Sequence, residues 1–318
     1  MMPEEYSFNQ EAPVIVIGGA GVDIVARLKS ELAKGSSILG NIRISFGGVA
    51  RNVAENLARL GQPVTLITVV GNDRFGEQLL EQTAAAGVDV RAVLRTSEQR
   101  TGTYLGIIGA KGMLQFAVDD MQTISALTPE YIHSQAGIFQ RASLVFLDAS
   151  LPKATMRAVM SQARKARIPV CADPTSTTLA ERLRPYLSSL YLVTPNSAEA
   201  SILCERPFEP SKRRQAIEAA KCLVSQGVGI AIIALAEFGV CYATSTTSGY
   251  VPAIRTEIID PTGAGDALTA TVLFALINSI PLDDAIRLGV SAASLTLRHI
   301  GSVLPDLSLE KLYDHLLI

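Results

Sequence analysis

The chain has 318 residues, 48% of them hydrophobic, and its 28 basic and 30 acidic residues give a net charge of -2. This is enough apolar sequence for a sizeable core, and the balanced charge argues against a nucleic-acid-binding protein and against a disordered chain. The four cysteines are far apart and form no C-x-x-C pair, which argues against a zinc site or a disulfide scaffold. The acidic start of the chain is unlike a secretory signal, and no apolar stretch is long enough to cross a bilayer, so we expect a cytoplasmic protein without a membrane partner.

The first part of the chain predicts alternating strands and helices. A β-branched run at Val14–Ile17 reads as a buried strand that ends at two glycines. Further strands are expected at 43–46 and 63–70, and helices at 49–60 and 75–86, each helix followed by a glycine. This alternation favours a parallel sheet covered by helices.

Residues 101–119 interrupt that rhythm. Two alternating stretches, TGTYLGII and MLQFAVDD, flank the glycine-containing loop 109–112 and predict a β-hairpin. Together with the short strands expected within 24–46, this hairpin forms a small separate sheet in our interpretation.

The alternation then resumes to the end of the chain. Strands are predicted at 144–147, 170–172, 191–193, 230–235 and 258–260, and a hairpin at 239–244 and 249–252. Helices are predicted at 153–167, 182–188, 197–204, 213–225, 266–278 and 282–299. Without a repeat or a long linker, the sequence favours a single domain over residues 1–318, with small β-segments at about 24–46 and 101–119.

The segment 260–267, DPTGAGDA, carries the clearest chemical signal. A predicted strand leads into two glycines and then directly into an apolar helix, whose first N–H groups form a site for an anion. Asp266 at the start of this helix has two interpretations. It is either an ordinary helix cap or a base that takes a proton from an alcohol while Gly263, Ala264 and Gly265 hold developing negative charge. The second interpretation suits phosphoryl transfer to a hydroxyl group.

DPTGAGDAL closely resembles the second signature of the ribokinase-like family of sugar and nucleoside kinases, from which Pro261 and Leu268 depart. Three other family elements occur in the right order: an aspartate in GGAGVD, an asparagine in GGVARN and the N-x-x-E of TPNSAE. The resemblance covers residues 14–305. It implies a three-layer α/β/α domain with a central, mostly parallel sheet and a small β-sheet lid, and in this family such lids produce homodimers.

The resemblance also implies roles for individual residues. Asp266 corresponds to the catalytic base, and Gly263, Ala264 and Gly265 to the anion hole. ATP and Mg²⁺ are implied at Asn196 and Glu199, the latter acting through a water. Further contacts to the nucleotide are implied at Gly239, Thr262, Gly263 and Gly265. The substrate positions are Asp23, Gly47, Gly48, Asn52 and Asp148. A monovalent cation such as K⁺ is implied at Asp260, Thr262, Thr296, His299 and Gly301.

The acceptor remains open between several hydroxyl compounds. The segment GGVARNVAENLARLG at 47–61 is closer to pseudouridine kinases than to ribokinases, and Asp120, after the hairpin, is a candidate contact for the base. Ribose, fructose, adenosine or another nucleoside is the alternative acceptor. A third hypothesis is a ligand-binding regulator without turnover, which the intact Asp266 disfavours. Glu237 stands where the family has a glycine-rich basic turn, so nucleotide preference is a further open question.

Overall fold

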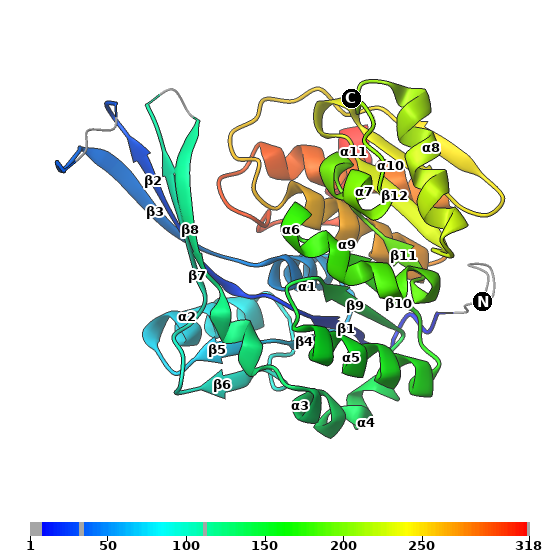
Figure 1. Ribbon diagram of the computed structural model, residues 1–318, viewed down its shortest axis with the longest axis horizontal. Coiled ribbons are helices and arrows are strands. Elements are labelled where there is room, and N and C mark those ends of the chain that lie inside the picture. Colours follow the sequence, from blue (N-terminus) through cyan, green and yellow to red (C-terminus); the bar gives the residue numbers. More distant parts are fainter. Residues whose placement is uncertain (1–7, 32–34, 111–112, 317–318) are drawn as a thin grey trace.

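The computed structural model describes residues 8–31, 35–110 and 113–316. Its main element is an eight-stranded sheet of order β14-β13-β12-β11-β10-β9-β1-β4, in which only β13 and β14 run antiparallel to their neighbours (Figure 1). The strands are β1 (Val14–Ile17), β4 (Val64–Ile67), β9 (Leu144–Asp148), β10 (Val170–Asp173), β11 (Leu192–Val193), β12 (Ile230–Ala234), β13 (Val240–Ala243) and β14 (Ser248–Val251). The carboxyl ends of the parallel strands share one edge of the sheet, which is where α/β proteins bind ligands.

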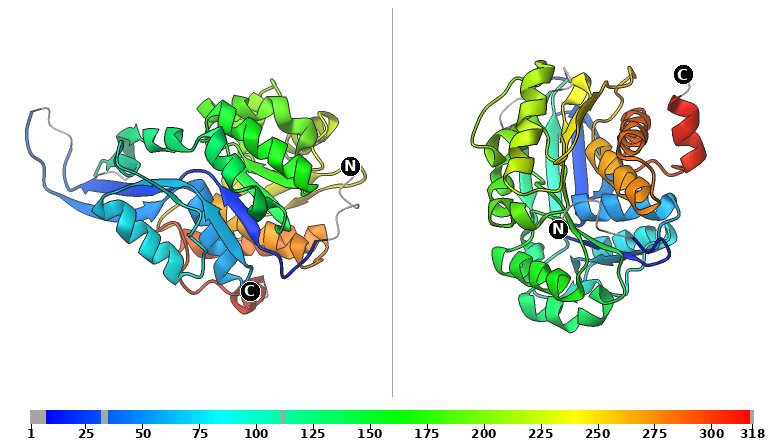
Figure 2. Two further views of the ribbon diagram at one scale, coloured as in Figure 1. Left: turned by 90° about the horizontal axis from the view of Figure 1, so that it is seen from below. Right: turned by 90° about the vertical axis from the view of Figure 1, so that its right-hand side faces the viewer.

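Helices cover both faces of this sheet, as Figure 2 (right) shows. Alternate residues of the buried strands divide between the two cores: Ile15 and Ile17 face one, Val14 and Val16 the other. The first core is covered by α3 (Pro129–Ser134), α4 (Ala136–Phe139), α5 (Lys153–Ala166), α6 (Thr177–Ala180), α7 (Ser197–Leu203) and α8 (Arg213–Ser225). The second is covered by α1 (Val49–Arg59), α9 (Ala264–Ile277), α10 (Leu282–Leu297) and α11 (Leu309–Leu316). The predicted three-layer α/β fold is confirmed.

A four-stranded sheet of order β3-β2-β7-β8 projects from the layered body (Figure 1). We call it the lid; its strands are β2 (Gly21–Leu28), β3 (Gly40–Gly47), β7 (Thr103–Ile108) and β8 (Leu114–Asp120). The strands β7 and β8 form the predicted hairpin, whose loop residues Lys111 and Gly112 lie outside the described residues. Because β2 begins directly after the loop that follows β1, the lid begins three residues earlier than the sequence predicts.

Two predicted strands differ from the structure. The predicted strand 63–70 is interrupted at Thr68: β4 stays in the main sheet, whereas β5 (Val69–Gly71) pairs with β6 (Leu94–Thr96), which the sequence did not predict. The segment 258–260 forms no strand, because Ile258 and Ile259 are exposed and the main-chain N–H groups of Ile259 and Asp260 both donate to the carbonyl of Leu297.

Three predicted helices differ from the structure by more than a single residue at one end. The helix predicted from Asp266 begins two residues earlier, at Ala264, and α10 ends at Leu297 rather than at residue 299. The helix predicted at 182–188 is a 3₁₀ helix, η3 (Glu181–Ser189), and contains Pro185, which has no N–H to donate. The remaining elements are α2 (Arg74–Ala85), η2 (Gln122–Ala126) and η4 (Ala236–Phe238). None of the described helices is long and apolar enough to cross a membrane.

Candidate active site

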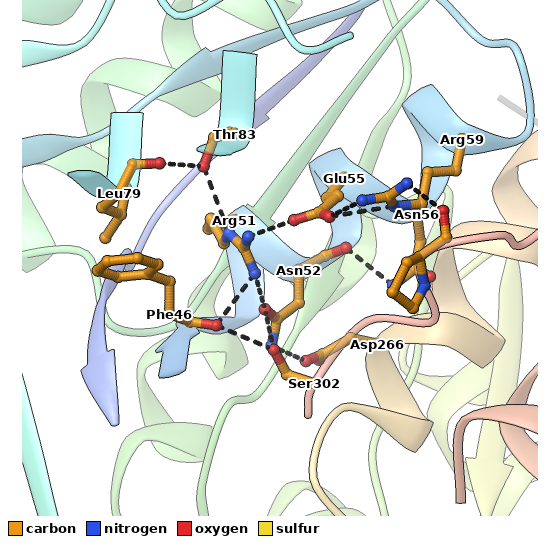
Figure 3. Close-up of polar contacts among 11 residues, drawn as sticks. Phe46, Arg51, Asn52, Glu55, Asn56, Arg59, Leu79, Thr83, Asp266 and Ser302 are labelled. Atoms are coloured by element: carbon orange, nitrogen blue, oxygen red, sulfur yellow. Dashed lines mark hydrogen bonds and ion pairs between the residues drawn. The ribbon is translucent and has the colours of Figure 1, made fainter. Parts of the chain in front are cut away.

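The predicted base and one predicted substrate residue are in direct contact. Nδ2 of Asn52, on α1, donates a hydrogen bond to Oδ2 of Asp266, on α9, at 2.8 Å (Figure 3). Asp266 does not cap its helix, since Gly263 occupies the cap position and no side-chain cap bond is present. The helix-cap interpretation of Asp266 is therefore wrong, and its carboxylate is not occupied by the N–H groups of α9.

The amide of Asn52 is held in one orientation. Its Oδ1 accepts hydrogen bonds from Oγ of Ser302 at 2.9 Å and from a terminal nitrogen of Arg51 at 3.3 Å (Figure 3). An oxygen that accepts from two donors leaves the amide nitrogen to face Asp266. The carbonyl of Phe46, in the lid strand β3, accepts from the same two donors, at 3.0 Å from Arg51 and 3.1 Å from Ser302.

Arg51 is a buried guanidinium, only 5% exposed. It pairs with Glu55 one helical turn later, and its Nε donates to Oγ1 of Thr83 at 3.3 Å. Burial lowers the pKa of Arg51, and the nearby Glu55 carboxylate opposes this effect. A buried charge needs such a partner, so Arg51 and Glu55 form one unit beneath Asn52.

Gly263–Gly265 form the turn into α9. Gly263 has φ 79°, and a Cβ there would lie 1.9 Å from the carbonyl oxygen of Ser302. Only glycine fits this position. The first N–H groups of α9, a 14-residue helix, have no partner within the helix, so this end of α9 has the properties of an anion hole.

The electrostatics of Asp266 suit a general base. Burial raises its pKa to about 7, whereas the hydrogen bond from Asn52 lowers it. The carboxylates of Asp148, Asp23 and Glu199 act in the same direction as burial. A carboxylate with a pKa near neutrality holds a proton more strongly than an ordinary aspartate and still ionises at physiological pH.

Asp23 lies on lid strand β2, across from Ser45 on β3. Burial raises its pKa to about 6, against the lowering effect of Arg43 and Arg51. A Cβ on Gly47 would lie 2.1 Å from Oδ2 of Asp23, so Gly47 gives this carboxylate its space. The structure thus brings Asp23 and Gly47 to the foot of the lid, beside the cap residue of α1, Gly48.

Asp148, at the end of β9, is fully buried and already saturated with donors. One oxygen accepts from the main-chain N–H of Gly19 at 2.8 Å and of Ala50 at 3.1 Å, and the other accepts from the main chain and hydroxyl of Ser150. In the structure Asp148 therefore anchors the loop after β1 to the start of α1. It does not cap the next helix, whose cap residue is Pro152.

Asn196 and Glu199 form a reciprocal capping box at the start of α7. Oδ1 of Asn196 accepts from the N–H of Glu199 at 3.0 Å, and Oε2 of Glu199 accepts from the N–H of Asn196 at 2.8 Å. Burial raises the pKa of Glu199. Burial and the charges of Glu199 and Asp266 raise the pKa of Asp173, at the end of β10, well above its usual value. These three carboxylates create a negative potential that favours a cation.

In the turn after β12, a residue other than glycine has a left-handed backbone conformation. Ala236 has φ 51°, a left-handed conformation that glycine adopts without strain. Gly239, at φ 94°, packs so closely on the carbonyl of Val251 that a Cβ would lie 2.3 Å from it. Glu237 is exposed between them.

The five residues implied as monovalent-cation ligands lie around the start of α9, but Asp260 is already engaged. Oδ2 of Asp260 lies 2.6 Å from a terminal nitrogen of Arg43 and accepts from the N–H of Gly301 at 3.2 Å. The carbonyl of Thr296 accepts from the N–H of His299 at 2.9 Å. Thr262 contributes its main-chain N–H to Oδ1 of Asp260 at 3.1 Å, and its side chain is exposed. Both oxygens of Asp260 thus already accept from N–H donors, whereas a cation at this carboxylate would require oxygen ligands.

Strand register places Asp120 away from Asp23. Thr103 pairs with both Asp120 and Val22, so these residues share one face of the lid. Asp119 shares the other face with Asp23, through Tyr104.

Sequence reasoning missed Arg43, Arg51 and Ser302. Arg51 lies within the GGVARN motif that also contains Asn52, so the motif could have identified it as a site residue. Ser302 and Arg43 reach the site only through the fold, because the chain folds them onto Asn52 and Asp260.

Residues 12–308 match the pfkB family carbohydrate kinases. Over 297 residues the chain is 30% identical to a pseudouridine kinase of Escherichia coli (strain K12), covering 93% of this chain and 94% of that protein. It is 27% identical to a guanosine-inosine kinase of Exiguobacterium acetylicum, covering 88% and 93%. The structure of Arabidopsis thaliana ribokinase complexed with ribose and ATP superimposes with a TM-score of 0.84 at 23% identity, covering 96% of this chain and 98% of that one.

Proposed function

This chain belongs to the pfkB family of carbohydrate kinases, and we propose that its acceptor is a nucleoside, pseudouridine, phosphorylated at the 5′-hydroxyl group with ATP as the donor. The observation that carries this proposal is the contact of Asp266 with Asn52 beside the glycine turn of α9. This arrangement places a base and an anion hole on the same helical turn.

In the proposed reaction, the 5′-hydroxyl transfers its proton to the carboxylate oxygen of Asp266 that does not accept from Asn52. The hydroxyl oxygen forms its new bond to the γ-phosphorus while the bond to ADP breaks. The free N–H groups at the start of α9 stabilise the charge on the transferred group. Asn52 keeps the base oriented throughout.

The sugar and the base of the acceptor lie under the inner face of the lid in this proposal. Asp23, Ser45, Tyr104 and Asp119 form one polar row across the four strands. Asp23 is suited to grip vicinal hydroxyls, and Tyr104 and Asp119 offer hydrogen bonds to a nucleobase edge. The row supports a nucleoside over a free sugar, because Tyr104 and Asp119 extend the polar face beyond Asp23 and suit the polar edge of a nucleobase.

The triphosphate lies between α9 and α7 in this proposal, with Mg²⁺ on its oxygens. Among the described residues no cluster of three metal-ligating side chains is present, which suits an ion held mainly by phosphate and water. Glu199 and Asp173 suit such an ion because burial and the charge of Glu199 raise the pKa of Asp173, and a cation placed there would relieve this repulsion. When bound, Mg²⁺ neutralises charge on the phosphates. Asn196 and Glu199 keep the start of α7 rigid beside it.

The outer face of the lid supports a homodimer. Ile42, Ile44, Phe116 and Val118 share this face, and their side chains are 73%, 54%, 47% and 53% exposed. An apolar patch of this kind is unusual on a monomer. We infer that a second copy packs its own lid against it.

The test is a coupled ADP-release assay with ATP and Mg²⁺ on pseudouridine, uridine, adenosine, ribose and fructose in parallel. We expect turnover with pseudouridine, a product phosphorylated at the 5′-position by ³¹P NMR, and loss of both in Asp266→Asn. Turnover only on free sugars would refute the nucleoside acceptor and keep the catalytic assignment. Equal turnover by Asp266→Asn would refute the base.

A further inference from the structure

The lid contributes a cation to the loop that precedes α9. Arg43, on the inner face of β3, reaches across to Asp260, and a terminal guanidinium nitrogen lies 2.6 Å from Oδ2 of that carboxylate. The Asp260 side chain is only 9% exposed and that of Arg43 is 35% exposed. A pair with one buried member is screened less by solvent than a surface pair.

Asp260 connects three segments of the chain. Besides Arg43 of the lid, it accepts from the N–H of Thr262 in the turn into α9 and from the N–H of Gly301 after α10. Both carboxylate oxygens therefore face N–H donors. A metal cation at Asp260 would compete with the guanidinium for Oδ2 and would meet N–H dipoles of the wrong sign.

We propose that the guanidinium of Arg43 takes the place of a monovalent metal ion at Asp260, and that the protein therefore binds no K⁺ there. We call Arg43 the resident cation of this loop. The guanidinium neutralises Asp260 and holds the turn at Gly263, three residues further along, in the geometry of the anion hole. Arg43 is a positioning residue, since it acts through Asp260.

Because the resident cation belongs to the lid, the order of the anion-hole loop depends on where the lid lies. Nε of Arg43 is buried and has no hydrogen-bond partner among the described residues, so one donor remains for a ligand under the lid. The positive charge also faces Asp23, which lies on the neighbouring strand β2. An acceptor that contacts Asp23 would therefore lie in the field of the same charge that holds Asp260.

The decisive measurement is thermal unfolding of the full chain in KCl and in tetramethylammonium chloride at equal ionic strength. We expect the same Tm in both salts for the natural protein. Arg43→Gln removes the charge and opens the place at Asp260, so its Tm should be higher in about 100 mM KCl by about 2–4 °C, as for an ion bound with millimolar affinity. Arg43→Lys keeps a charge and should stay indifferent to the salt.

Arg27→Gln is the matched control, because Arg27 is an exposed arginine of the same lid, on β2. It should leave Tm and its salt dependence unchanged. The proposal is overturned if the natural protein is more stable in KCl than in tetramethylammonium chloride, or if Arg43→Gln stays indifferent to the cation.

This inference rests on the proposed kinase function only where it concerns the anion hole, and a second readout separates the two. The affinity for a non-hydrolysable ATP analogue, measured calorimetrically, should fall about tenfold in Arg43→Gln without K⁺ and recover with K⁺ or guanidinium. If the natural protein binds no nucleotide, the kinase proposal fails while the Tm comparison still decides the role of Arg43.

Discussion

Replacing Asn52 by alanine tests the assignment of Asp266 as the base. The hydrogen bond from Asn52 at 2.8 Å lowers the pKa of Asp266, which burial raises to about 7. A hydrogen bond to a charged group contributes about 1.5–3 kcal/mol, and one pH unit corresponds to about 1.4 kcal/mol. Asp266 is partly exposed to solvent, which screens the interaction, so we expect the lower end of this range. The ionisation of Asp266 should move to higher pH by about one unit.

The assay is the pH dependence of kcat/KM, which reports ionisations of the free enzyme. For the natural protein we expect the rate to rise with pH through an acidic limb near the pKa of Asp266, because only the ionised carboxylate accepts the proton. In Asn52→Ala this limb should shift to higher pH. Ser302→Ala is the control, because Arg51 still holds the amide of Asn52. An acidic limb that is absent, or unmoved in Asn52→Ala, would refute the reasoning.

Four further variants test the structure. Asp266→Asn should lower kcat by about 10³-fold. It should also raise the free energy of unfolding at pH 8 by about 1–2 kcal/mol in urea titrations. The reason is that the pKa of Asp266 is higher in the folded than in the unfolded state, so the natural protein loses stability as pH rises from about 4 to about 7. At pH 4.5 the stabilisation by Asp266→Asn should therefore be smaller. Gly263→Ala should unfold at a lower urea concentration because its Cβ would overlap a carbonyl oxygen, whereas Gly265→Ala, with open space around its Cβ, should not. Ala236→Gly should stabilise the protein by about 0.5–1 kcal/mol, by relieving the left-handed φ of 51°, and an unchanged or lower Tm would contradict this. Ile42→Asp should yield a monomer in sedimentation velocity, with Asn41→Asp on the opposite lid face as the control, and an unchanged sedimentation coefficient would argue against packing through the outer face.

The central sheet was predictable because its strands are continuous apolar runs between glycines. Val14–Ile17 is buried at every position, as a strand covered on both faces must be. The segment around Ile258 was not predictable in the same way. Its two isoleucines have the composition of a strand, yet they are exposed, because the nearest main-chain partner is the end of α10 rather than a sheet edge. Local composition does not determine which main-chain groups a segment will hydrogen-bond to.

Site residues were predictable where a motif fixes them and hidden where the fold alone brings them together. Asp266 and Asn52 belong to separate motifs 214 positions apart, and the structure joins them in one hydrogen bond. Asp120 was singled out as a contact for the base, yet strand alternation places Asp119, and not Asp120, on the lid face that carries Asp23. A one-residue difference in register decides this, and no spacing in the sequence determines the register of four strands.

The carbonyl of Phe46 connects the lid to the hydrogen bonds that orient Asp266. Phe46 is the penultimate residue of β3, and its carbonyl accepts from both Arg51 and Ser302, the two donors that hold the Asn52 amide. A displacement of β3 therefore changes the hydrogen bonds of the amide that orients Asp266. Arg43 connects the same strand to Asp260 on the other side of the anion hole. One strand of the lid thus contacts both the residues that orient Asp266 and the carboxylate before the glycine turn, so we expect a displacement of β3 to affect both together.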